Sequence, residues 1–156
     1  VTKTGIISVL ATRRTLQSEK FARLRERHAG NVTVLEDACL GWVDLVERGE
    51  LDGERALALV RAVIEPQLSR GADVLVLGCT HYPFLRPLIE RVAGDRASII
   101  DPAGAVAREL QRRLTEAAIL NEGKGGSARF VSSADLGRAP SVISTLWGEP
   151  VQVEGM

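Results

Sequence analysis

The sequence predicts an α/β protein built on a parallel sheet with flanking helices, and two observations support this prediction. Short apolar runs of strand length alternate along the chain with longer amphipathic stretches of helix length. The run at 73–79 is apolar at nearly every position, which is typical of a parallel strand covered on both faces.

Each element can be placed by its residues. Strands are expected at 4–11, 31–37, 73–79, 97–101, 128–133 and 150–154. Helices are expected between them, at 15–30, 39–50, 53–71, 83–94, 103–120 and 134–148. The third helix has one apolar stripe at helical spacing, formed by Leu57, Val60, Ile64 and Leu68.

Capping residues agree with these boundaries. Asp52 and Asp101 each precede a helix, and Pro83 fits the first turn of another, where its missing N–H is harmless. Glycines that favour helix ends follow three of the stretches, at Gly30, Gly71 and Gly94.

Composition excludes several classes of protein. The 156 residues include 20 basic and 20 acidic side chains, so the formal charge cancels, which argues against nucleic acid or an acidic membrane as partner. No apolar run approaches the roughly 18 residues of a membrane-spanning helix. No secretory leader is visible, and Cys39 and Cys79 are expected to be free thiols, so a cytoplasmic location is predicted.

The glycine-rich stretch at 121–127 is expected to be a surface loop. A phosphate-binding loop is disfavoured there, because no strand leads into the stretch, no helix opens from it, and its Gly–Lys order does not fit.

Chemistry is indicated where the strand at 73–79 ends, because Cys79 is its last residue and Thr80 and His81 follow directly. Ligands of open α/β sheets bind beyond the carboxyl ends of the strands. A thiolate there is stabilised by the following helix and by a nearby imidazole, and His81 can transfer protons near neutral pH. Two alternatives stay open, since a cysteine is often buried and structural, and Cys-x-His supplies two of the four ligands that zinc usually needs.

The segment VLGCTHYPFLRPLIE at 76–90 resembles the second catalytic-cysteine motif of glutamate racemases. The segments at 5–24, 38–50 and 99–114 are similar to further parts of that family, so the resemblance extends from about residue 4 to 114. What it implies is a two-base racemase that needs no cofactor or metal and acts on glutamate. One thiolate removes the Cα proton from one face, and a second thiol protonates the other.

The resemblance also implies roles for four residues. Cys79 is the base that acts on the L-isomer, His81 and Glu47 assist it, and Thr80 contacts the substrate. Without the resemblance, Glu47 would be interpreted as a solvated surface acid and Thr80 as the start of a helix. Helix capping is expected for Thr12, Thr15 and Ser18, with lining of the site mouth as the alternative, and a structural role is expected for Cys39.

The chain departs from the family pattern in one major respect. Nothing in it matches the opening half-domain, which supplies the other catalytic cysteine. Residues 1–100 are therefore expected to form the complete second lobe, and 101–156 to return to the other lobe. This predicts a chain that is inactive alone and exposes apolar surface, favouring homo-oligomers. The alternatives are a non-catalytic binding remnant and a racemase for another amino acid, such as aspartate.

Overall fold

The structure, a computed structural model, describes residues 2–121, 123 and 125–156. Its strands form two parallel sheets, one with the order β2-β1-β3-β4 and one that pairs β5 with β6. The strands are β1 (Ile6–Leu10), β2 (Thr33–Asp37), β3 (Val74–Leu77), β4 (Ser98–Ile100), β5 (Phe130–Ser132) and β6 (Val153–Gly155). Each overlaps an expected run, so the prediction of a parallel α/β fold is confirmed.

The helices follow the expected order, with two interruptions. They are α1 (Arg13–Leu16), α2 (Glu19–His28), α3 (Trp42–Glu47), α4 (Glu54–Ser69), the 3-10 helix η1 (Tyr82–Leu85), α5 (Arg86–Ala93), the 3-10 helix η2 (Gly94–Arg96), α6 (Ala103–Glu116) and α7 (Ala139–Trp147). The stretch at 15–30 divides because the Ser18 side chain accepts the Phe21 N–H and starts a new helix. The stretch at 83–94 divides near Pro87, which has no N–H to continue the ladder of hydrogen bonds.

Most capping predictions are confirmed. Thr12 and Ser18 are N-caps, as expected, but Thr15 is not, because it lies inside α1 and donates its own N–H to the Thr12 hydroxyl. Asp52 and Asp101 differ from expectation, because each lies one residue before the N-cap position of its helix. Asp101 still serves its helix, since its Oδ1 accepts the N–H of Ala103.

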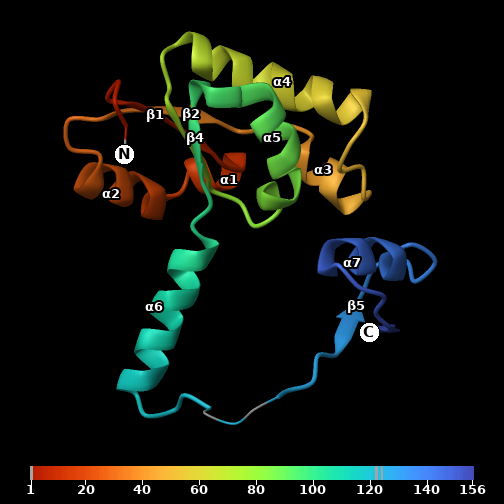
Figure 1. The fold of residues 1–156 in the computed structure, drawn as a ribbon. Helices are drawn as coiled ribbons and strands as arrows, with labels where there is room; N and C mark the ends of the chain where they lie inside the picture. The colour runs from red at the N-terminus through yellow and green to blue at the C-terminus, as the bar shows by residue number, and fades with distance from the viewer. Residues whose placement is uncertain (1, 122, 124) are drawn as a thin grey trace.

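The core lies between the large sheet and the layer of α3, α4 and α5 (Figure 1). The sheet contributes Leu10, Leu75 and Leu77, all at most 1% exposed. The predicted stripe of α4 faces them and is confirmed, with Leu57, Val60 and Ile64 buried and Leu68 partly so. At the edge nearest the end of β3, Trp42 and Tyr82 are fully buried and pack edge to face with ring centroids 5.0 Å apart.

Residues after 101 contact this core less. Figure 1 shows α6 extending away from the sheet, and α6 has no buried residue. Apolar side chains on this part of the chain are exposed, among them Val106, Leu110, Ile119, Val131 and Leu136. The predicted loop at 121–127 includes 122 and 124, which lie outside the described residues. Within the described part of the chain, no helix is long and apolar enough to cross a membrane.

Gly78 is required where β3 ends, because two strands approach each other closely there. Its N–H donates to Leu10 O at 2.7 Å, and a Cβ at this position would lie 2.9 Å from the Cβ of Ala11. We expect Gly78→Ala to lower the free energy of unfolding by about 1–3 kcal/mol, because the strand ends must separate to admit the methyl group. Urea denaturation followed by circular dichroism measures this change.

Gly126→Ala is the matched control, since a Cβ at Gly126 has nothing within 4 Å. We expect that variant to unfold within about 0.5 kcal/mol of the parent chain. Equal stability of the two variants would contradict the close-approach explanation for Gly78.

Candidate active site

The carboxyl ends of β2, β1 and β3 meet at one edge of the large sheet. The Gly78 N–H bonds to Leu10 O, and the Ala11 N–H bonds to Asp37 O at 3.1 Å. Cys79 therefore emerges beside the end of β1 and leads through Thr80 and His81 into η1. This is the edge at which open α/β sheets bind ligands.

Three of the predicted site residues form one hydrogen-bonded line. His81 Nδ1 lies 3.8 Å from Cys79 Sγ, and His81 Nε2 lies 2.7 Å from Glu47 Oε1. Because the Glu47 carboxylate only accepts, Nε2 is the nitrogen that donates, which leaves Nδ1 facing the thiol. A carboxylate, an imidazole and a thiol in this order can move a proton to or from sulfur.

Helix stability does not explain a glutamate at the end of α3, whereas the hydrogen bond from His81 does. It is the last residue of α3, where a negative charge opposes the helix dipole. Its side chain is 65% exposed, as a surface acid would be, yet it bonds to an imidazole 34 residues away in the sequence.

Thr80 is exposed, and no hydrogen bond to its hydroxyl is present among the described residues. The following helix η1 has His81 at its N-cap position and no side-chain cap, so Thr80 does not start it. The Thr80 hydroxyl is thus available to a ligand next to the thiol.

Cys39 occupies a different environment from Cys79, although both are free thiols, as predicted. It is 2% exposed, and its Sγ donates to Asp37 O at 3.5 Å. Burial, and then the nearby charge of Asp37, raise the pKa of the Cys39 thiol far above its usual range. A thiol buried in the core cannot contact a substrate at the edge of the sheet, which agrees with the structural role expected for Cys39.

Three polar residues beneath this edge were not predicted from the sequence. Ser8 and Gln67 are buried, and Gln67 connects Ser8 with Asp37 at the end of β2. The signal was present, because Gln67 follows Ile64 by three residues and so lies on the apolar face of α4. A polar side chain on such a face requires hydrogen-bond partners in the core.

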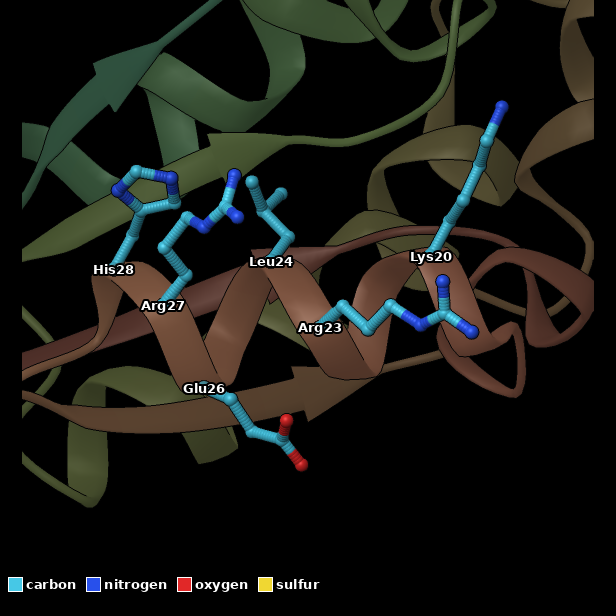
Figure 2. Close-up of a pocket in the computed structure, with 6 residues that line it drawn as sticks. All are labelled: Lys20, Arg23, Leu24, Glu26, Arg27 and His28. Atoms are coloured by element: carbon cyan, nitrogen blue, oxygen red, sulfur yellow. The ribbon is translucent and has the colours of Figure 1, made fainter.

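Several cavities lie near these elements, among them one of about 660 Å³ after β1 that Thr12, Thr15 and Ser18 line in part. One of about 370 Å³ adjoins Glu47 and Arg48 and is otherwise lined by 132–143. Another of about 720 Å³ lies along α2, where Figure 2 shows Leu24, Arg27 and His28 on one side of the helix and Glu26 on the other. None of its lining residues belongs to the Cys79–His81–Glu47 line, so that line, rather than the larger cavity, marks the candidate site.

Zinc would need further ligands beside Cys79 and His81. Within the described ranges, no three His, Cys, Asp or Glu side chains lie together as metal ligands would.

Comparison with known proteins identifies the family. The sequence model of the Asp/Glu/Hydantoin racemase family matches residues 2–110. The chain is 44% identical over 153 residues to the glutamate racemase of Pseudomonas putida. The matched region covers 98% of this chain and 58% of that protein. It is 47% identical over 135 residues to the glutamate racemase of Herpetosiphon aurantiacus, which covers 86% of this chain and 53% of that protein.

A solved structure agrees with these relatives. The crystal structure of a glutamate racemase isoform from Bacillus anthracis matches all of this chain and 59% of its own, with a TM-score of 0.85 and 29% identity. The chain thus spans a little under three-fifths of the length of the relatives that it matches. From its sequence and its fold, the chain belongs to the Asp/Glu/Hydantoin racemase family.

Proposed function

We propose that this chain is the part of a glutamate racemase that supplies one of two acid/base thiols, Cys79. The hydrogen-bonded line from Glu47 through His81 to Cys79 is the observation that supports this most directly. The names of its relatives, glutamate racemases at 44% and 47% identity, favour glutamate over aspartate as the substrate.

The chemistry follows from the donors and acceptors of the line. His81 Nδ1 accepts the S–H proton of Cys79, while Glu47 holds the Nε2–H on the opposite side of the ring. The thiolate then takes the Cα proton of L-glutamate, so that a C–H bond breaks, an S–H bond forms and the electron pair stays on the substrate. Thr80 stabilises that charge through its hydroxyl and backbone N–H. No cofactor takes part in these steps.

A second thiol must deliver a proton to the opposite face of the substrate, and this chain does not provide it. Cys39 is the other cysteine of the sequence, and it is buried in the core, away from the edge at which Cys79 lies. We therefore propose that the chain alone does not racemise glutamate, and that the second thiol comes from a lobe outside these 156 residues.

Residues 1–100 form, in this proposal, the complete lobe that holds Cys79, and 101–156 return to the other lobe. The exposed apolar side chains after residue 101 support this division, since such side chains usually pack against a partner surface. In the chain alone the same surface favours homo-oligomers. The whole enzyme would act in the cytoplasm and supply D-glutamate for peptidoglycan.

Loss of the Cα proton of glutamate in D2O, followed by NMR, tests the proposal. We expect slow exchange of L-glutamate without inversion, because the thiolate removes the Cα proton, the resulting S–H exchanges with D2O, and a deuteron returns to the same face. Cys79→Ala should reduce this exchange by roughly 100-fold or more, the usual contribution of an acid/base group. Cys39→Ala is the matched control and should retain it.

Two results would contradict the proposal. Exchange that persists in Cys79→Ala would exclude Cys79 as the base. A parent chain that binds L-glutamate and exchanges no proton would favour the non-catalytic alternative, a racemase fold that binds a ligand without turnover.

A further inference from the structure

A line of polar groups runs through the core to the end of β2. Ser8, at the centre of β1, donates from its Oγ to Gln67 Oε1 at 3.3 Å. Gln67 Nε2 in turn donates to Asp37 Oδ2 at 3.2 Å. Buried polar groups require such partners, and apolar residues of similar shape often stabilise a core equally well. Core stability alone therefore does not explain why Ser8 and Gln67 are polar.

The line ends on a strained turn. Asp37 Oδ1 accepts the backbone N–H of Cys39 at 2.8 Å, and Cys39 has a φ of 46°, in the left-handed region. A non-glycine residue there is strained and persists only where its surroundings hold it. Asp37, fixed in turn by Gln67, is the group that holds it.

This turn directs the chain into α3. The Trp42 N–H at the start of α3 donates to Cys39 O at 3.1 Å, and the helix ends at Glu47. Six helical residues span about 8 Å, so a tilt of about 10° at the first residue moves the last one by more than about 1 Å. Such a shift is enough to break the 2.7 Å bond between Glu47 and His81.

We propose that Asp37 and Gln67 are positioning residues that hold Glu47 against His81. The inference deepens the proposed function and depends on it, because the bond from Glu47 fixes which imidazole nitrogen faces Cys79. Neither residue touches the reacting atoms. They act through the Cys39 turn and the direction of α3.

The tautomer of His81 reports this positioning without any turnover of substrate. Nitrogen NMR of the neutral imidazoles distinguishes a proton on Nε2 from one on Nδ1, and His28, exposed on α2, is an internal reference. We expect the parent chain to carry the proton on Nε2. Glu47→Ala, which removes the acceptor, should give a mixture of tautomers.

The test compares two substitutions at one position. Asp37→Ala should move the His81 nitrogen signals at least about half of the way toward those of Glu47→Ala, with His28 unchanged. Asp37→Asn should retain the parent signals, because its Oδ1 still accepts from Cys39 and its amide can pair with Gln67 once the Gln67 amide turns over. Parent-like signals in Asp37→Ala would overturn the proposal.

If Asp37→Ala does not fold, Gln67→Leu tests the same positioning proposal. Leucine suits the apolar face of α4, and the variant deprives Asp37 of one of its two partners. We expect a smaller shift of the His81 signals in the same direction, and no shift would overturn the proposal. The His81 nitrogen signals can be measured even if the proton-exchange test fails, so the two proposals can be contradicted separately.

Discussion

Iodoacetamide should alkylate Cys79 of the folded chain at least about 1,000-fold faster than Cys39, because a reagent reaches Cys39 only after an opening that costs on the order of 4 kcal/mol. Cys79 is partly exposed beside His81, whereas Cys39 is 2% exposed. Burial and the charge of Asp37 also raise the pKa of Cys39, so little thiolate forms there. Mass spectrometry of the two cysteine peptides over time gives both rates.

Two controls separate the effect of solvent exposure on the alkylation rate from the effect of thiolate formation. In concentrated urea the two cysteines should react at similar rates, since both are then exposed. His81→Ala should slow the alkylation of Cys79 roughly tenfold at neutral pH, because the thiolate loses its imidazole partner. Rapid alkylation of Cys39 in the folded chain would contradict the buried, protonated thiol described above.

Much of this fold could be predicted because its signals are local. A strand such as β3 is recognisable from four successive apolar residues, and α4 from the spacing of Leu57, Val60 and Ile64. The motif at Cys79 and His81 is local as well, and a strand end followed by a proline-containing helix places it correctly at the edge of the sheet.

The contact between Glu47 and His81 could not be predicted from the residues alone. It joins positions 34 apart, and it depends on the direction in which α3 leaves the end of β2. The chain between them takes a positive φ at Cys39 and again at Gly41, and no local pattern indicates this conformation at the non-glycine residue. Only the family resemblance pointed to Glu47.

The position of Gln67 in the sequence indicated a buried polar contact that was not predicted. Its polarity on the apolar face of α4 required a buried partner, but periodicity gives the face of a residue and not its contacts across the core. For the same reason, Asp37 was predicted only as the end of a strand. The two hydrogen bonds that its carboxylate accepts come from a backbone N–H two residues later and from a helix 30 residues away.

Trp42→Ala should lower the free energy of unfolding by about 3–5 kcal/mol, the usual result of removing a large aromatic side chain from a core. Trp42 is fully buried, packs edge to face on Tyr82, and donates from its indole N–H to Leu59 O at 3.3 Å. The variant leaves a cavity and removes the indole hydrogen bond to Leu59 O. Urea denaturation followed by circular dichroism measures the loss.

Trp147→Ala is the matched control, because the same atoms are removed from a side chain that is 54% exposed. Trp147 also packs edge to face, on Phe130, and also donates its indole N–H, to Glu149. Since the two tryptophans differ chiefly in burial, we expect the control to cost less than about 1 kcal/mol. If both substitutions lowered the free energy of unfolding equally, the packing of Trp42 would not stabilise the contact between α3 and η1. The same packing then could not hold Glu47 within reach of His81.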